Sequence, residues 1–421
     1  MEGGPLSVTQ NVFSSQSRDD DSKGRESRTS MAGRSLVTLD DISTGQILEL
    51  IHKARYIESN REKVAGTCNG RVLATLFYEP STRTRLSFET AMLRLGGHVV
   101  GFPSAKLSSA TKGETVYDTL KVVSNYADVV AIRHPKEGAV LVAADAADVP
   151  VINAGDGGHM HPTQTLADLA TLDSRLGRFT DITIGLCGDL RFGRTVHSLI
   201  ETLCRFGGVR FVLISPEELR TPRYVRDVID ASATCSYVET GSLTDVIGDL
   251  DALYMTRVQQ ERFENESDYL RLRDTYVLDT EKMTLAKPNM PVLHPLPRVN
   301  EIARDVDKDP RAAYFEQTRQ GMLMRMALES SVLGDELAGY DPLGGVDLTV
   351  HDDGAQNGQD EGSFARLARS SILIDGVCPN PHCITTSENG LEQRCYRIVT
   401  GDDVRTGAAG RRCVYCDAEL D

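Results

Sequence analysis

The chain has 421 residues, of which 40% are hydrophobic and 25% charged, and it contains no Trp. This composition is typical of a globular protein with two to three domains. The formal net charge of -15 argues against broad binding to nucleic acids or anionic membranes, because phosphate groups are held by surplus Lys and Arg. No apolar run approaches the roughly 20 residues of a bilayer-spanning helix, and the N-terminus lacks the apolar core of a signal peptide. We therefore expect a cytoplasmic protein.

Three compositional zones divide the chain. Residues 1–33 are rich in Ser, Asp, Arg and Gly, which predicts a disordered tail. From about residue 35 to residue 333, short apolar runs alternate with amphipathic stretches, which predicts strand–helix units around parallel sheets. Between about residues 334 and 359 Gly and Asp dominate and large apolar residues are few, which indicates a linker.

The first clear strand–helix unit begins with a predicted strand at residues 71–79. Apolar residues recur at helical spacing from Phe88 to Leu95, so a helix follows the strand. Three hydroxyl residues and two arginines are crowded into residues 81–85, where this helix is expected to begin. A helix N-terminus offers free N–H groups and the positive end of the helix dipole, so the crowding indicates an anion site. The alternative is that Ser81 only caps the helix and the arginines are solvated.

A second unit consists of a predicted strand at residues 182–187, a glycine-rich turn at 188–193, a helix, and another strand at 211–215. This order is typical of the start of a doubly wound domain. The expected fold class is therefore α/β, with two doubly wound parallel-sheet domains. A nucleotide-dependent oxidoreductase is an alternative, but the glycine spacing is not Gly-x-Gly-x-x-Gly and no acidic ribose partner ends the next strand.

Five of the nine cysteines lie after residue 377, and four of them form two closely spaced pairs: Cys378 with Cys383, and Cys413 with Cys416. Thiolates at these spacings can converge on a tetrahedral zinc, and four protein ligands make a structural rather than a catalytic site. In a small β-rich C-terminal domain, such a metal would supply much of the folding free energy. Cys395 or His382 could replace one ligand, and a set of free thiols is the remaining alternative.

The run from Phe77 to Glu89 closely resembles the carbamoyl phosphate motif of the aspartate and ornithine carbamoyltransferases. The resemblance continues with few gaps from about residue 35 to residue 333. It implies that the phosphate is held by Ser81, Thr82, Arg83 and Thr84. Thr84 is also implied to reach the carbonyl oxygen of the carbamoyl group.

Two further segments resemble family segments that contact the carbamoyl group. Arg133-His134-Pro135 implies that Arg133 contacts both the phosphate and the carbonyl. His161-Pro162-Thr163-Gln164 implies that His161 donates to the carbonyl oxygen and that Gln164 contacts the carbamoyl amide. Fixed donors aimed at an oxygen that gains negative charge lower the barrier to amine attack. The reaction therefore needs no nucleophilic side chain, no covalent intermediate and no catalytic cofactor.

The same resemblance implies three residues that select L-aspartate as the second substrate: Arg194, Arg257 and Gln259. A dicarboxylate needs two separated cationic contacts, which arginine forks suit, whereas the cationic side chain of ornithine would not favour Arg257. Ornithine enzymes also typically carry His-Cys-Leu-Pro where this chain has His294-Pro295-Leu296-Pro297. Pro295 and Leu296 are implied to contact the substrates, with a cis Leu296–Pro297 bond placing the Leu296 carbonyl against the amine. Transfer to ornithine or another amino acid is the alternative.

Residues 107–114 resemble a mobile loop that enters the active site of a neighbouring subunit. Ser108 and Lys112 are then implied to bind phosphate, and Lys112 also contacts aspartate. The alignment needs a one-residue gap, so Ser109 is the alternative to Ser108. The loop implies a homotrimer with shared active sites.

Glu79 resembles a glutamate that pairs with Arg194 and Arg262 when the two domains close. Closure would expel water and bring carbamoyl phosphate and L-aspartate together. The expected products are N-carbamoyl-L-aspartate and phosphate, in an early step of de novo pyrimidine biosynthesis. Asn300 stands where many relatives have Asp.

The family resemblance divides the chain as follows: a carbamoyl phosphate-binding domain at 34–162 completed by a helix at 315–334, an aspartate-binding domain at 163–314, a linker at 335–368, and a zinc-binding domain at 369–421. Residues 377–384 resemble the zinc domain of the separate regulatory chain found with some bacterial aspartate carbamoyltransferases, which docks onto catalytic chains. That chain also has a nucleotide-binding domain of roughly 100 residues, for which the linker leaves no room, so we expect no CTP or ATP regulation through it. The zinc domain is expected to hold subunits together, in an assembly larger than the trimer; a separate adaptor or nucleic-acid-binding module is the alternative.

Overall fold

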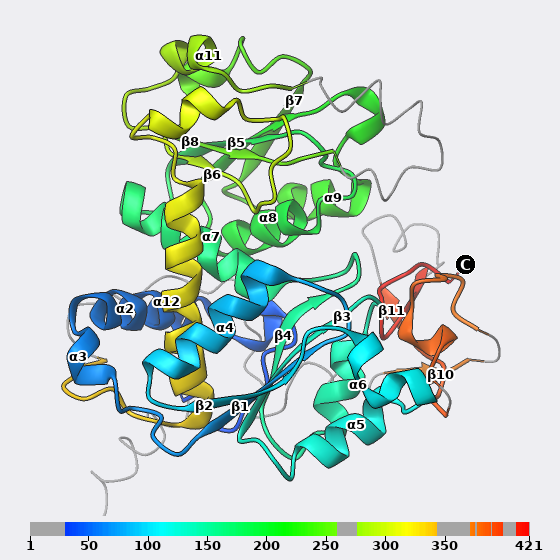
Figure 1. Ribbon diagram of the computed structural model, residues 1–421. Helices are drawn as coiled ribbons and strands as arrows, with labels where there is room; N and C mark the ends of the chain where they lie inside the picture. Colours follow the sequence, from blue (N-terminus) through cyan, green and yellow to red (C-terminus); the bar gives the residue numbers. More distant parts are fainter. Residues whose placement is uncertain are drawn as a thin grey trace, which may run out of the picture.

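The computed structural model describes residues 30–258, 276–342, 371–374, 377–388, 390–398 and 410–420. Figure 1 shows two α/β units joined by the long helix α12 (Tyr314–Leu333), with a small third unit against the first. Among the described residues, no helix is both long enough and apolar enough to cross a membrane. Residues 1–29 of the tail expected at 1–33, and residues 343–368 of the linker expected at 335–368, lie outside the described residues.

The first unit is built on a four-stranded parallel sheet in the order β2-β1-β3-β4. The strands are β1 (Val72–Phe77), β2 (His98–Phe102), β3 (Val129–His134) and β4 (Val151–Asp156). The helices around it are α2 (Thr44–Ser59), α3 (Arg61–Val64), α4 (Thr82–Arg94), α5 (Val116–Val123), α6 (Ala139–Ala146) and α7 (Pro162–Leu176). Short 3-10 turns lie at η1 (Leu39–Asp41), η2 (Ala105–Leu107) and η3 (Ser109–Lys112).

Successive side chains of β1 point to opposite faces of the sheet, and both faces are apolar, so helices pack on both of them. Leu73 and Phe77 face a core shared with α2, α4, α7 and α12. Ala74 and Leu76 face a second core shared with α5 and α6. The sheet is therefore buried on both sides, as expected for parallel strands.

The second unit is a five-stranded parallel sheet in the order β7-β6-β5-β8-β9. Its strands are β5 (Ile182–Cys187), β6 (Val209–Ile214), β7 (Ser236–Thr240), β8 (Ala252–Met255) and β9 (Val292–Leu293). Its helices are α8 (Arg194–Phe206), α9 (Arg223–Ala231) and α11 (Thr280–Leu285), with 3-10 turns at η4 (Glu217–Leu219), η5 (Ile247–Asp249) and η7 (Arg304–Lys308). Helix α12 then returns to the first unit and contacts α7, α2 and α4.

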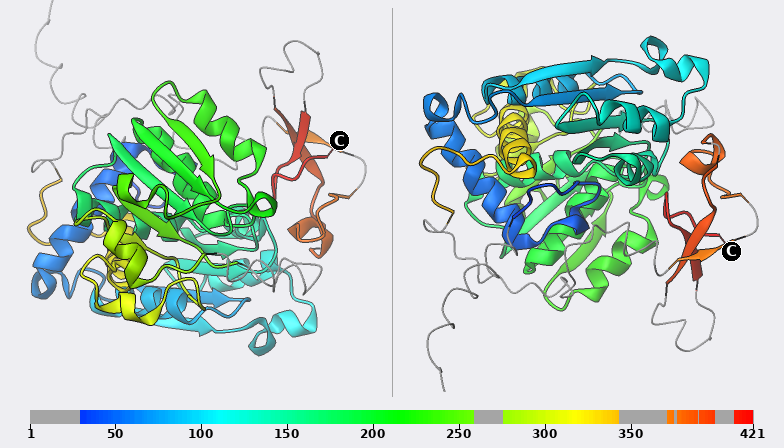
Figure 2. Two further views of the ribbon diagram at one scale, coloured as in Figure 1. Left: turned by 90° about the horizontal axis from the view of Figure 1, so that it is seen from above. Right: turned by 90° about the horizontal axis from the view of Figure 1, so that it is seen from below.

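The third unit is a small antiparallel sheet of β10 (Ile372–Leu373), β11 (Arg394–Ile398) and β12 (Gly410–Cys413), with a 3-10 turn at η8 (Ile384–Thr386). Figure 2 places it to one side of the two larger units in both further views. The predicted fold class, two doubly wound parallel sheets and a small β-rich C-terminal unit, is confirmed. The exact domain boundaries remain predictions.

The chain continues to pack beyond α12. Asp335 Oδ1 accepts from Arg71 Nη2 at 2.8 Å. Leu337 is buried, and the Tyr340 ring packs edge-on against Tyr56 of α2. At the other end of the described chain, Gly33 N donates to the Val332 carbonyl at 2.8 Å. Residues before α2 and residues after α12 are thus both fastened to the first unit or to α12.

Candidate active site and metal centre

A pocket of about 840 Å³ lies between the two parallel-sheet units. Eleven of the residues singled out from the sequence line it: Glu79, Ser81, Arg83, Thr84, Arg133, His161, Gln164, Arg194, Arg257, Pro295 and Leu296. Gln259 and Arg262 lie outside the described residues. Thr82, Ser108 and Lys112 are described but do not line this pocket.

Strand order explains why the pocket lies here. In each sheet the chain runs outward in both directions from a central pair of strands, β1 with β3 and β5 with β8. Ligand sites of open α/β sheets form beyond the carboxyl ends of such pairs. Three arginines occupy these positions: Arg133 at the end of β3, Arg194 after β5 and Arg257 after β8. The two switch points face one another across the pocket, so the arginines share it.

The start of α4 is built to receive a ligand rather than to be capped. Ser81 occupies the N-cap position, but its side chain makes no capping hydrogen bond to the first turn. Its hydroxyl instead donates to Thr84 Oγ1 at 3.0 Å. The N-terminal end of α4 therefore keeps backbone donors and the positive end of its dipole directed at the pocket.

Arg83 stands in a positively charged environment. Burial, followed by the nearby charges of Arg133 and Arg257, lowers the pKa of Arg83 from its ordinary value. Glu79 supplies one compensating charge, with its Oε2 2.7 Å from Arg133 Nη2. Crowding several guanidinium groups raises their free energy, and a bound anion relieves it. The pocket thus favours a multiply charged anion.

Glu79 pairs with Arg133 of its own unit in this structure. Across the pocket, Arg194 Nη1 donates to the Gly157 carbonyl. The predicted pairing of Glu79 with Arg194 and Arg262 belongs to a closed state of the domains and stays a prediction.

His161 is held as a neutral imidazole. Burial, together with the positive charges of Arg194, Arg133 and Arg325, keeps the pKa of His161 well below its usual range. Arg325 Nη2 donates to Thr163 Oγ1 at 3.1 Å, and Thr163 Oγ1 lies 3.4 Å from His161 Nδ1. With Arg325 donating to its oxygen, the Thr163 hydroxyl can direct its own proton at Nδ1. His161 then carries its proton on Nε2, where it can serve as a hydrogen-bond donor.

Gln164 and the loop before α12 are held by buried partners. Gln164 Nε2 donates to Asp168 Oδ1 at 2.7 Å. In the loop, the predicted cis Leu296–Pro297 bond is present. His294 Nδ1 accepts from Leu296 N at 2.8 Å, and His294 Nε2 lies 2.6 Å from Glu301 Oε1. Burial lowers the pKa of His294, so its neutral ring accepts at Nδ1 and donates at Nε2.

The loop that carries Ser108 and Lys112 is turned away from this pocket. The Ser108 hydroxyl donates to the Ala105 carbonyl at 2.9 Å within its own turn. Lys112 is exposed at the end of η3 and precedes Gly113, which has a φ of +89°. Leu107 in the same loop is 71% exposed. This loop thus presents Leu107 and Lys112 to solvent in the single chain.

Four buried residues around the pocket were not assigned a role from the sequence: Thr163, Asp168, Gln317 and Arg325. Asp168 follows Gln164 by four residues on α7, a spacing that places both on one helix face and could have marked it. Gln317 and Arg325 reach the site from α12, and no local pattern connects them to it.

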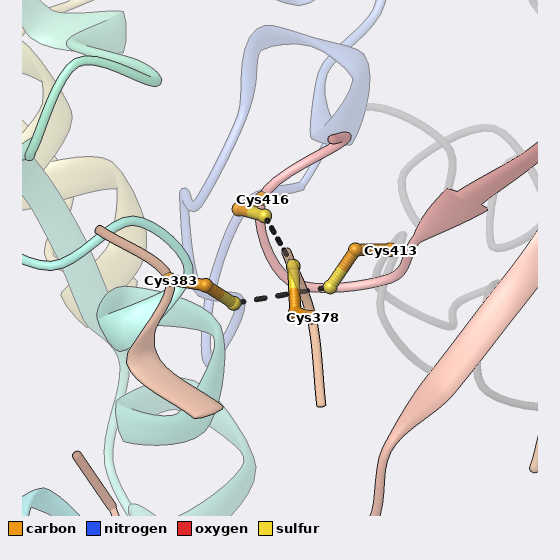
Figure 3. Close-up of side chains that lie close together, drawn as sticks. All are labelled: Cys378, Cys383, Cys413 and Cys416. Atoms are coloured by element: carbon orange, nitrogen blue, oxygen red, sulfur yellow. Dashed lines mark hydrogen bonds between the residues drawn. The ribbon is translucent and has the colours of Figure 1, made fainter. Parts of the chain in front are cut away.

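The C-terminal unit brings four thiols together (Figure 3). The Sγ atoms of Cys378, Cys383, Cys413 and Cys416 all lie within 4.8 Å of one another, and all four residues are buried. Cys378 Sγ is 3.6 Å from Cys416 Sγ, and Cys383 Sγ is 3.8 Å from Cys413 Sγ. A tetrahedral metal with bonds of about 2.3 Å to sulfur separates its ligands by about 3.8 Å. The four cysteines are therefore positioned to bind a metal ion, whereas Cys395 and His382 lie outside this group.

The C-terminal unit docks on the first parallel-sheet unit. Glu137 N donates to the His382 carbonyl at 2.9 Å, and Ile384 N donates to the Glu137 carbonyl at 2.9 Å. Asn380 Nδ2 donates to Glu137 Oε2 at 2.6 Å. Next to Cys416 of the thiol cluster, Asp417 Oδ2 lies 3.2 Å from His159 Nε2. This side of the thiol cluster thus contacts the segment that leads to His161.

Models of known families match most of the catalytic portion. The carbamoyl-P binding domain of aspartate/ornithine carbamoyltransferases matches residues 34–174, and their Asp/Orn binding domain matches residues 180–332. The chain is 77% identical over 313 residues to the aspartate carbamoyltransferase catalytic subunit of Bifidobacterium longum (strain DJO10A), a match that covers 74% of this chain and 98% of that protein.

Solved structures show the same likeness. The catalytic subunit of M. jannaschii aspartate transcarbamoylase has a TM-score of 0.68 at 44% identity, covering 73% of this chain and 100% of that one. Aspartate transcarbamoylase from Trypanosoma cruzi, in complex with carbamoyl aspartate and phosphate, has a TM-score of 0.68 at 41% identity, covering 72% and 97%. The chain belongs to the aspartate/ornithine carbamoyltransferase family and is a carbamoyltransferase enzyme.

Proposed function

We propose that the protein transfers the carbamoyl group of carbamoyl phosphate to the amine of L-aspartate, giving N-carbamoyl-L-aspartate and phosphate in de novo pyrimidine biosynthesis. One observation carries this: a single pocket joins the N-terminus of α4 and Arg133 from one sheet to Arg194 and Arg257 from the other. An anion-binding helix end suits a phosphoryl group. Two arginines on the opposite wall suit a dicarboxylate.

In this proposal the phosphate is bound by the turn at Ser81, Thr82, Arg83 and Thr84. Arg133 bridges the phosphate and the carbonyl, and the Nε2–H of His161 donates to the carbonyl oxygen as negative charge grows there. The aspartate amine attacks the carbonyl carbon directly, the bond to phosphate oxygen breaks, and phosphate leaves. Leu296 contributes its carbonyl as acceptor for the amine, with Pro295 beside it.

Aspartate is favoured over ornithine by the charge of the pocket. Arg194 and Arg257 enter from the second unit, and no acidic side chain from that unit lines the described pocket. The ammonium group of ornithine would meet these guanidinium groups and be repelled. Gln259 and Arg262 are assigned to aspartate binding and to closure by family resemblance alone.

The second proposal concerns assembly. Ser109 and Lys112 are exposed, Ser108 is half-buried, and none of them lines the pocket of their own chain, which supports a role in the site of a neighbouring chain. A homotrimer with shared sites is then the smallest active unit. Docked C-terminal units on its outside could join such trimers into larger assemblies.

The metal proposed for the C-terminal unit is zinc in a closed structural site. Four thiolates and no open position suit Zn²⁺, and thiols kept reduced for metal binding suit a cytoplasmic protein. Residues 369–421 would then be a zinc domain like that of the regulatory chain, joined to domains at 34–162 and 163–314 by the linker at 335–368.

Arg83→Ala tests the anion site, with Arg85→Ala as its matched control. Arg85 lies on the same helix but pairs with Glu89 at 2.6 Å and does not line the pocket. We expect Arg83→Ala to lower kcat/KM for carbamoyl phosphate about 100- to 1,000-fold, because a donor to developing charge is lost. Arg85→Ala should stay within about tenfold of the native enzyme. Full activity of Arg83→Ala in a carbamoyl-aspartate assay would contradict the assignment.

Shared sites predict complementation between inactive variants. We expect Lys112→Ala and Arg83→Ala each to be nearly inactive alone. Co-expressed in equal amounts, they should regain about a quarter of native activity, because random assembly gives that fraction of sites both native residues. Activity of the mixture equal to the sum of the separate variants would refute the shared site.

Metal analysis tests the thiol cluster. We expect the native chain, purified under reducing conditions, to hold about one zinc ion. Cys413→Ser should lose it and expose the C-terminal unit to proteolysis, since the metal supplies folding free energy. Cys395→Ser, a buried cysteine outside the cluster, should keep it. Equal zinc loss in both variants would rule out this set of four ligands.

A further inference from the structure

The buried carboxylate of Asp168 lies where three elements that line or adjoin the pocket meet, namely α7, β8 and α12. Asp168 of α7 is fully buried. Its Oδ1 accepts from Gln164 Nε2 on the same helix and from Gln317 Nε2 on α12. Its Oδ2 accepts from the Tyr254 hydroxyl of β8 at 2.9 Å. Tyr254 lies three residues before Arg257, so the carboxylate touches both parallel-sheet units and the helix that joins them.

In its ionised form the Asp168 carboxylate can only accept hydrogen bonds, and it then dictates how each glutamine amide is turned. Gln164 directs its amino group at Asp168, so its Oε1 is the atom left to face the pocket. An acceptor is the group that a carbamoyl –NH2, which donates, requires. If the Gln164 amide were reversed, two donors would face each other and the carbamoyl amide would lose its partner.

Asp168 also orients the amide of Gln317, which in turn contacts the loop that carries His294 and Leu296. Gln317 also directs its amino group at Asp168, and its Oε1 accepts from His294 N at 3.0 Å. The His294 ring in turn accepts from Leu296 N at 2.8 Å. The loop backbone at Leu296 is therefore tied, through three hydrogen bonds, to the carboxylate that turns Gln164.

We propose that Asp168 is a positioning residue that fixes which atoms Gln164 and Leu296 present to the carbamoyl group and the attacking amine. This inference rests on the proposed function and adds a residue that touches neither substrate. Burial raises the pKa of Asp168 to about 7 in spite of three donors and the positive charge of Arg325. A group this costly to bury is characteristic of a functional site.

Asp168→Leu, Asp168→Asn and Asp173→Asn form the test. Leu has nearly the shape of Asp but offers no acceptor, so both glutamine amides lose their orientation. Asn can keep its oxygen toward the glutamines and turn its amino group to Tyr254, whose hydroxyl can accept. Asp173 is the matched control, a partly buried carboxylate further along α7 that pairs with Arg55 and does not line the pocket.

We expect Asp168→Leu to lower kcat/KM for carbamoyl phosphate about 100-fold, Asp168→Asn to stay within about tenfold, and Asp173→Asn to match the native enzyme. Inhibition by inorganic phosphate should be unchanged in all three, because the cradle at α4 does not depend on Asp168. Weaker phosphate binding in Asp168→Leu in proportion to the lost activity would show general disruption and overturn the proposal. So would equal losses in the Leu and Asn variants, or full activity of Asp168→Leu.

The outcome can be separated from failure of the proposed function. If the native protein makes N-carbamoyl-L-aspartate, the reaction stands whatever the Asp168 variants do. Gln317→Leu is an independent test. It removes the hydrogen bonds that connect Asp168 to His294 and Leu296, but it leaves Gln164 hydrogen-bonded to Asp168. Its defect should fall on the KM for aspartate, and an equal rise in the KM for carbamoyl phosphate would contradict the path described.

Discussion

The feature on which the rest of the site depends is a group of arginines gathered in one pocket of an otherwise acidic protein. The chain carries a net charge of -15, yet Arg83, Arg133, Arg194 and Arg257 are brought to the same pocket from four separate segments. Within the described pocket lining, Glu79 is the only acidic side chain. Repulsion among guanidinium groups is unfavourable in the unliganded state and becomes favourable attraction when phosphate and carboxylate groups enter. The fold supplies the enforced proximity, because both topological switch points open onto the pocket.

Buried residues behind the pocket arginines set the hydrogen-bonding orientation of the side chains that face the ligand. Arg325 donates to the Thr163 hydroxyl, which lies 3.4 Å from His161 Nδ1 and can donate to it. Asp168, which only accepts, determines the orientation of Gln164. A reaction that relies on fixed donors and acceptors, with no nucleophilic side chain, needs such control because a reversed amide or imidazole changes attraction into repulsion. Both groups are buried, so water cannot substitute for them.

Functional groups that lie close together in the chain were predictable from the sequence. Contacts between residues far apart in the chain were not. The crowded hydroxyls and arginines at residues 81–85 and the spacing of Cys378, Cys383, Cys413 and Cys416 lie close in the chain, so composition and spacing expose them. Asp168 meets Tyr254 and Gln317 across 86 and 149 positions, and His159 meets Asp417 across 258. Such contacts arise from tertiary packing, which no periodicity encodes. The family resemblance assigned roles to residues that touch substrate, and it was silent on those that orient them.

The central claim is that carbamoyl transfer goes to aspartate. The most direct measurement supplies the full chain with carbamoyl phosphate and, separately, L-aspartate, L-ornithine and other amino acids, and follows both phosphate release and the carbamoylated product. N-carbamoyl-L-aspartate should form with one phosphate per turnover, and ornithine should react at least about 1,000-fold more slowly because the partly buried Arg194 and Arg257 repel its ammonium group. Comparable rates with ornithine, or phosphate release without carbamoyl-aspartate, would contradict the account.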